Sequence, residues 1–313
     1  TGSEWPEAVE LAKRMVADSG DSMRGVLLYG SRLHKTNPDK HSALDFVVLV
    51  GDYRAFYEAL SGSGEMHRPV GLMTGLSALL APNVIAYTPD EGREGLAKCL
   101  IVSKDDFARA LGPNPPDHFS LGRMLQRVGE VWFANADEAE WARAQIRGAH
   151  LRVLDWMAPY LTAPVDAASL GRRLLEVCYQ GELRPESRSR SDAIFEKQAE
   201  HFANALAPAL DAAAASGAMV KEGDLYRLSQ PVSPAEARRW RRHFRRSKVR
   251  STARWFKHMM TFANWLPYVT RKVERHTGRT IELTTLEKKL PLIFLWPRAI
   301  HVLVTRPRRE IRS

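Results

Sequence analysis

The sequence predicts an α+β fold in three successive regions, and three observations carry this prediction. Short apolar runs of strand length alternate with helical patterns in the first 115 residues. The proline-rich stretch GPNPPDHFS then marks a joint, and almost every later segment has a helical pattern. From Pro234 to the end the chain carries 21 Lys and Arg against 5 Asp and Glu, whereas the 233 residues before it carry 25 against 31. We expect a mixed-sheet domain over 1–115, a helical domain over 116–232 and a basic amphipathic region over 233–313.

The elements follow from local patterns in chain order. Apolar residues at helical spacing and a closing Ser-Gly predict a first helix over 6–20. Two apolar runs, 25–30 and 43–50, predict buried strands joined by a loop rich in Pro, Asn, His and Lys. A helix over 53–60, strands over 83–89 and 96–103, and a helix from 104 with acidic residues in its first turn complete the first region. Beyond the joint, helices are expected over 121–134, 138–161, 168–181 and 192–217.

The cysteines, the first residues and the most apolar run indicate the cellular compartment of the protein. Cys99 and Cys178 each sit inside an apolar or helical segment, which fits reduced, packed thiols in a reducing compartment. The first residues lack the basic and apolar pattern of a secretory signal. The most apolar run, LPLIFLWPRAIHVLV at 290–304, is too short and interrupted for a spanning helix, which needs about 20 residues. We expect a cytoplasmic protein without a transmembrane helix.

The stretch VLLYGSRLHKTNPDKHSALDFVVLV, residues 26–50, is the first candidate for chemistry. Gly30 and Ser31 follow one apolar strand, and the carboxylate of Asp45 stands at the mouth of the next. Glycine allows a close backbone approach to a ligand, and a hydroxyl with nearby amides can hold phosphate oxygens. A carboxylate there can hold Mg²⁺ that grips a triphosphate, although a loop cap is the simpler interpretation.

Further motifs continue in order down the chain. The pair YGS and DF covers Tyr29, Gly30, Ser31, Asp45 and Phe46. The strand KCLIVS begins with Lys98, the segment GRMLQR holds Arg123 and Arg127, and YQGELR holds Tyr179, Gly181, Glu182 and Arg184. Lys98 alternates with apolar neighbours, so it is either directed at a ligand or simply an exposed strand lysine. Arg123 and Arg127 lie one turn apart on one helix face, where solvation is the expected role.

Taken together, these motifs resemble the mitochondrial-type phosphatidate cytidylyltransferases, the translocator assembly and maintenance family, within the polymerase-β-like nucleotidyltransferase superfamily. The resemblance covers about Tyr29 to Arg184. It departs from the superfamily at Val47, where a second carboxylate is usual. It departs from the family at Glu182, where aspartate is usual, and His67 is a weak counterpart of a family histidine.

The resemblance implies a polymerase-β-like fold and a reaction that joins CTP and phosphatidate into CDP-diacylglycerol and pyrophosphate, with Mg²⁺ as cofactor. It implies catalytic roles for Asp45, Lys98 and Glu182, with Asp45 and Glu182 as metal ligands. It also implies nucleotide and phosphate binding by Tyr29, Gly30, Ser31, Lys98 and Arg184. Phosphatidate already carries an anionic phosphate at neutral pH, because the second pKa of a phosphate monoester is about 6. No general base is therefore required.

The basic region predicts a polyanionic partner. Ten basic and no acidic residues lie between Arg238 and Lys257, with aromatic residues interleaved. Such a pattern suits an anionic membrane surface or nucleic acid, and the apolar run that follows favours lipid. Packing against the protein body is the simpler alternative. The residues expected to contact a membrane, on the inner face as a peripheral protein, are Trp240, Phe244, Trp255, Phe256 and Trp265.

Two rival functions remain at this stage. A nucleotidyltransferase acting on RNA would use the basic region to grip the acceptor, and its binding would weaken steeply with salt. A catalytically inactive nucleotide-binding or lipid-binding module is the second rival, since Val47 removes the usual second carboxylate.

Overall fold

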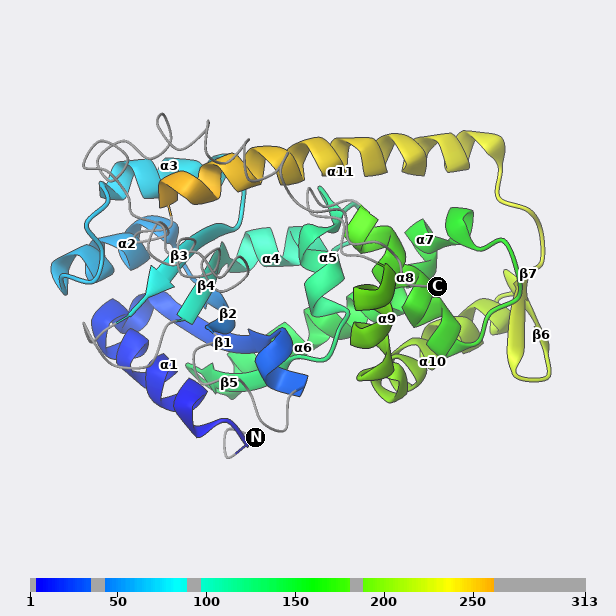
Figure 1. Ribbon diagram of the computed structural model, residues 1–313, viewed down its shortest axis with the longest axis horizontal. Coiled ribbons are helices and arrows are strands. Elements are labelled where there is room, and N and C mark those ends of the chain that lie inside the picture. The colour runs from blue at the N-terminus through cyan, green and yellow to red at the C-terminus, as the bar shows by residue number, and fades with distance from the viewer. Residues whose placement is uncertain (1–3, 35–42, 89–96, 181–187, 262–313) are drawn as a thin grey trace, which may run out of the picture. The chain divides into compact units, whose positions relative to one another are not determined.

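The computed structural model describes residues 4–34, 43–88, 97–180 and 188–261 (Figure 1). It confirms the predicted α+β class, with a five-stranded mixed sheet, a two-stranded sheet and helices around them. By their contacts the residues up to Thr261 form one compact unit. The divisions at 115/116 and 232/233 stay predictions, and residues 262–313 lie outside the described part of the chain.

The described elements run along the whole unit. The helices are α1 (Pro6–Ser19), α2 (Tyr53–Gly62), α3 (Val70–Leu79), α4 (Lys104–Leu111), α5 (His118–Met124), α6 (Ala136–Leu151), α7 (Val153–Met157), α8 (Ala167–Gln180), α9 (Arg188–Glu196), α10 (Ala199–Ala215) and α11 (Pro234–Thr261). The strands are β1 (Met23–Tyr29), β2 (Leu44–Val50), β3 (Asn83–Tyr87), β4 (Ala97–Ser103), β5 (Gly129–Phe133), β6 (Met219–Glu222) and β7 (Leu225–Leu228). Short 3₁₀ turns are η2 (Gly20–Ser22), η3 (Ser31–His34) and η4 (Ala158–Tyr160).

The main sheet has the order β3-β4-β2-β1-β5. Strand β2 is antiparallel to β1 and parallel to β4, with α2, α3 and β3 in the crossover between them. Strand β3 is antiparallel to β4, and β5 is antiparallel to β1. Such a mixed sheet, with a parallel pair at its centre, needs cover on both faces.

Alternating side chains divide the sheet into two faces. On the first face, Phe46, Val48 and Val50 of β2 join one buried core with residues of α1 and α2. On the second face, Val47 of β2 and Leu100 of β4 lie under α4 and α5. The sequence period of two therefore fixes which residues of β2 and β4 can face a ligand: the odd-numbered positions of β2, and the even-numbered positions of β4.

The predicted helix over 121–134 is wrong in its second half. Helix α5 ends at Met124, and GEVWF forms β5, the edge strand beside β1. The physical reason is tertiary pairing: Val131 enters the core, and the valine and aromatic residues suit a pleated surface better than a helix. Helix α3 and the hairpin β6–β7 were not predicted, and the predicted helix over 138–161 is divided into α6, α7 and η4.

Helix α11 packs against the body through charged residues that composition alone assigns to a solvated face. Arg254 is 2% exposed and donates to Asp117 at 2.7 Å, and Arg250 donates to the same carboxylate at 3.0 Å. Burial acts to raise the pKa of Asp117, but the charge and hydrogen bonds of these arginines outweigh it and lower that pKa. A buried acid with two arginine partners therefore anchors the helix.

Lys257 forms a second anchor, on the last turn of α3. Its ammonium donates to the carbonyl of Leu76 at 3.3 Å, to that of Pro82 at 2.8 Å and to that of Leu80. A cation is favourable at a helix C-terminus, where carbonyl groups lack helical partners. Burial, and then the charge of Arg254, lowers the pKa of Lys257 to about 7. The helix thus ends against α3 and β3, where Thr261 also donates to the carbonyl of Val84 at 2.8 Å.

We expect the variant Asp117→Asn to lower the free energy of unfolding by about 3–5 kcal/mol, because it leaves a buried arginine without its counter-charge. Equilibrium urea denaturation measures the change. Arg254→Met should cost a similar amount, and the double variant should cost less than the two together. Arg147→Met, which breaks the exposed pair with Glu140, is the control and should cost less than about 1 kcal/mol. Additive effects of Asp117→Asn and Arg254→Met would contradict the anchor.

Acid should destabilise the protein through His118. Its ring lies against Trp156, His243 and Phe244, with centroids 5.1, 5.2 and 5.2 Å away. Burial, and then the charge on His243, lowers the pKa of His118 to about 3, although Asp117 acts in the opposite direction. Because the folded pKa lies below the unfolded value of about 6.5, the stabilisation is complete above pH 6.5 and is lost as the pH falls below it.

The test compares wild type with His118→Phe in urea denaturation at pH 7.5 and pH 5.5. We expect wild type to lose about 1.4 kcal/mol more than the variant between these values. Equal losses would show that His118 titrates normally in the folded protein.

Candidate active site

Three of the predicted site residues lie in one row across the centre of the main sheet. Asp45 of β2 pairs with Tyr29 of β1 on one side and with Lys98 of β4 on the other. Residues paired in register point to the same face, so all three side chains belong to the second face. The alternating pattern that predicted each strand thus brings a phenol, a carboxylate and an ammonium group together at one sheet end.

Gly30 supports the carboxylate of this row. Its φ is +84°, a conformation that favours glycine, and a Cβ built there would lie 2.8 Å from Asp45 Oδ2. The backbone therefore passes directly against the carboxylate, and a side chain at this position would collide with it. Ser31 follows, exposed, as the first residue of η3, and the amide of Leu33 donates to the carbonyl of Gly30 at 3.2 Å.

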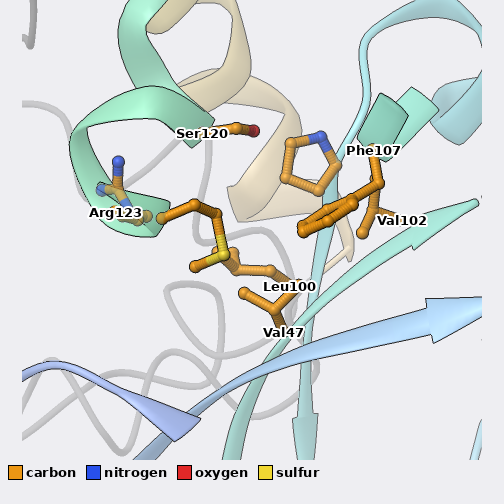
Figure 2. A pocket seen from close by; sticks show the side chains of 8 residues that line it. Val47, Leu100, Val102, Phe107, Ser120 and Arg123 are labelled. Carbon is orange, nitrogen blue, oxygen red and sulfur yellow. The ribbon is translucent and has the colours of Figure 1, made fainter. Parts of the chain in front are cut away.

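A small hollow lies beside this row on the same face, with about 10 Å³ of room for water-sized molecules, and it is partly open to solvent (Figure 2). Val47 and Leu100 lie next to Asp45 and Lys98 along their strands and form its floor, and Phe107 closes one side. Ser120 and Arg123 of α5 face it from above. Because Val47 is buried in this apolar wall, the position where the superfamily usually has its second carboxylate offers no metal ligand.

Arg123 is more than the solvated residue expected from its helix face. It is partly buried, with its guanidinium 3.7 Å from the centroid of the Phe119 ring, and it donates to the carbonyl of Phe119 at 2.7 Å. The prediction that Arg123 and Arg127 share one helix face is wrong, because α5 ends at Met124 and Arg127 lies in the connection to β5. Arg127 lies further out, with its side chain 52% exposed and 3.8 Å from Glu4.

Helix α11 adds a histidine to the same face. Its His258 lies with its ring centroid 6.3 Å from that of Phe119, and Nε2 is buried without a hydrogen-bond partner among the described residues. Burial, and then nearby cations, lowers the pKa of His258 to about 2. These cations are Lys257, Lys98, Arg254 and Arg123. Of these cations, Lys98 and Arg123 belong to the candidate site, whereas Arg254 is paired with Asp117 and Lys257 with carbonyls at the end of α3. The sequence pattern gave no signal for His258.

The side chains of the site suit Mg²⁺ when the substrate supplies most of the metal's ligands. Within the described ranges no group of three or more His, Cys, Asp and Glu side chains could hold a metal ion. Mg²⁺ in nucleotide enzymes needs only one or two carboxylates when substrate phosphates and water supply the other oxygens. Asp45, held against Gly30 and next to Lys98, fits that mode. Its negative charge, after burial, also contributes to raising the pKa of the buried Cys99 thiol.

Two predicted site residues, Glu182 and Arg184, lie outside the described residues. Helix α8, which precedes them, packs on α5: a Cβ built on Gly122 would lie 2.9 Å from Cys178 Cβ. In the same contact, the side-chain amide of Gln126 donates to the hydroxyl of Tyr179 at 3.3 Å. The helix that contains the first two residues of the YQGELR motif therefore contacts the helix that carries Arg123.

The predicted membrane-contact residues divide. Trp240 is only 5% exposed and packs edge-on against His243, with centroids 5.2 Å apart, so the expected lipid contact is wrong for this residue. Phe244 is partly buried against His118 and Tyr160. Of the remaining aromatics, Trp255 is partly buried, Phe256 is exposed and Trp265 lies outside the described residues. In the described part of the chain, no helix has the length and apolar character needed to cross a membrane.

Sequence comparisons add no relative. No family model matches the chain, and no curated protein is similar enough to count as a match. The site must therefore be judged on its own residues.

Gly30→Ala should disturb the site more than a matched glycine elsewhere. Gly64 has nearly the same φ, +86°, with nothing within 4 Å of a built Cβ, whereas at Gly30 the Cβ meets Asp45. We expect Gly64→Ala to cost about 1–2 kcal/mol of stability from backbone strain alone. Gly30→Ala should cost clearly more in urea denaturation, because the Asp45 carboxylate must also move. Equal costs would show that the close approach is unimportant.

Proposed function

We propose that this chain is a Mg²⁺-dependent phosphatidate cytidylyltransferase that works as a peripheral protein on the cytoplasmic face of a membrane. The observation that carries the proposal is the row of Tyr29, Asp45 and Lys98 with Gly30 and Ser31 at its end. An anion-binding turn, one carboxylate and one strand lysine on a single sheet face are the parts that nucleotidyl transfer to a phosphate requires.

The arrangement of strands supports a polymerase-β-like core without deciding the substrate. Strands β1 and β2 form an antiparallel pair, and the chain returns through helices to β4, parallel to β2. In such a core the carboxylate-bearing strand lies at the centre, as β2 does here. Cytidine and phosphatidate as substrates rest on the ordered motifs YGS, DF, KCLIVS, GRMLQR and YQGELR.

The proposed reaction balances without a general base. An anionic oxygen of the phosphatidate phosphate attacks the α-phosphorus of CTP, and a new P–O bond forms. The bond from the α-phosphorus to the bridging oxygen of the β-phosphate breaks, and its electron pair leaves with pyrophosphate. No proton has to be removed from the nucleophile, whose second pKa is about 6. Positioning and charge neutralisation would supply the catalysis.

Each residue has a role consistent with its place. The turn at Gly30 and Ser31 would hold phosphate oxygens through its amides and hydroxyl, and Lys98 would neutralise the triphosphate next to it. Asp45 would hold Mg²⁺, with Glu182 as the second ligand that the resemblance implies. When bound, Mg²⁺ would offset the charge that develops on the leaving pyrophosphate. Arg184 would bind phosphate from the helical region. Arg123 would assist, because it lines the hollow with Val47 and Leu100, the strand neighbours of Asp45 and Lys98.

The test is direct transfer of label. Purified protein, Mg²⁺, CTP labelled at the α-phosphate and phosphatidate in detergent micelles should give labelled lipid. Asp45→Asn, which keeps the shape of the side chain, should lower the rate by about 100-fold or more. Asp21→Asn changes an exposed aspartate away from the row and is the matched control, with a rate close to wild type.

Other outcomes would decide against the proposal. Label that enters added RNA and not lipid would indicate the RNA nucleotidyltransferase. Binding of CTP without pyrophosphate release, with Mg²⁺ or Mn²⁺ present, would indicate an inactive binding module. Equal losses in Asp45→Asn and Asp21→Asn would remove Asp45 from the site.

A further inference from the structure

Most of the large exposed apolar side chains of the described chain belong to two helices. Leu72 and Leu79 are on α3, and Leu79 is 77% exposed. Val249, Phe256 and Met260 are on α11. The others are Leu151, Val220 and Leu225, on α6 and the β6–β7 hairpin. Scattered exposed leucines need no explanation, but neighbouring ones on adjacent helices do.

Helix α3 is unusual for an exposed helix because its sequence, VGLMTGLSAL, contains no charged residue. Leu72 and Leu79 are seven residues apart, so they lie on one stripe, with exposed Gly75 between them. On the opposite side, Met73 and Ser77 are buried. The solvent-facing side of this helix therefore offers only apolar atoms and backbone.

The C-terminal half of α11 lies beside this helix (Figure 1). Lys257 reaches the carbonyls of the last turn of α3, and Ala253 and Met260 are its neighbours on the helix surface, four residues before and three after it. Both are exposed. Val249, Ala253, Phe256 and Met260 form an exposed apolar stripe on the half of α11 that Lys257 holds against the end of α3.

The same stripe of α11 becomes basic toward its N-terminus. Arg238, Arg242 and Arg245 precede Val249 at helical spacing, and Arg241, Arg246 and Lys248 flank them, all exposed. These side chains are exposed to solvent, whereas those of Arg254 and Lys257 are buried in contacts with the body. An apolar area next to a row of solvent-exposed cations is complementary to a partner surface that has an anionic outer layer over an apolar interior.

We propose that the exposed faces of α3 and α11 together form the surface by which this protein binds an anionic lipid bilayer. Leu72, Leu79, Phe256 and Met260 enter the interfacial region, and the arginines of the first half of α11 bind lipid headgroups. The basic region is therefore one half of the surface, and α3, which lies far away in the sequence, supplies the other half.

The body-facing side of α11, opposite this surface, reaches the candidate active site. Pro82, whose carbonyl accepts from Lys257, also lines the hollow beside Asp45 and Lys98. A protein bound by α3 and α11 would hold that hollow close to the headgroup layer. The inference deepens the proposed function and rests on it for the identity of the lipid substrate, whereas the binding itself requires no catalysis.

The experiment is co-sedimentation of the full chain with vesicles, without CTP or Mg²⁺. Vesicles contain phosphatidylcholine alone, or phosphatidylcholine with phosphatidylglycerol or with phosphatidate. We expect binding to both anionic vesicles and little to the neutral one. The variants Leu72→Glu with Leu79→Glu, and Phe256→Glu with Met260→Glu, should each weaken binding by about tenfold or more. Replacing Arg241, Arg242 and Arg245 with Gln should weaken it by about fivefold for each arginine.

Leu151→Glu with Leu225→Glu is the matched control, because it places two acidic groups at exposed leucines outside the surface, and it should bind like wild type. Thermal unfolding of each variant checks that the fold is kept. Unchanged binding by the α3 variant would overturn the proposal. Failure of wild type to bind anionic vesicles would also overturn it, whether the surface is covered by residues 262–313 or by a second copy of the chain. Light scattering would detect the second copy. Lipid binding without label transfer would overturn the proposed reaction and leave this surface standing.

Discussion

The register of β1, β2 and β4 is the constraint on which the site depends. Tyr29, Asp45 and Lys98 lie in one row only because the three strands pair at those residues. A slip of one residue in β2 would turn Asp45 toward the core of α1 and α2 and bring Phe46 to the ligand side. That slip is strongly opposed, since it would remove Phe46, Val48 and Val50 from the buried core. The same apolar alternation that stabilises the sheet therefore positions the carboxylate.

Helix α11 shows that the sequence alone does not distinguish buried charged side chains from exposed ones. The helix carries ten basic residues between Arg238 and Lys257, yet two of them are buried in specific contacts. Arg254 bonds to Asp117, and Lys257 bonds to carbonyls at the end of α3. Removing the Asp117 carboxylate would leave the buried Arg254 charge unpaired, a far larger penalty than losing a surface ion pair. The helix is thus an integral part of the unit as well as a basic surface.

The sequence predicted what local pattern determines. Strands β1 to β4, the helices α1, α2 and α4, and the α+β class all followed from apolar periodicity. The motifs named Tyr29, Asp45 and Lys98, and the strand register places these three residues in one row. Prediction from the sequence failed where tertiary pairing decides, as in GEVWF, which is a strand because β1 offers an edge. It also failed where partners are distant in sequence. The neighbouring sequence does not indicate that Arg254 is buried, because its partner Asp117 lies 137 positions away.

The C-terminal end of α11 connects the candidate site with the proposed membrane-binding surface. The side of α11 that holds Arg254, Lys257 and His258 faces the body, and the side that holds Phe256 and Met260 faces outward, within the same two turns. Because Lys257 and Thr261 fix these turns on α3 and β3, the helix cannot shift outward without breaking the contacts that keep His258 near Lys98 and Arg123. The cationic face of the site and the apolar face of the surface therefore move together. For the proposed transfer between dissolved CTP and a lipid held in a bilayer, such a rigid connection would keep the reacting phosphates at a fixed height above the lipid.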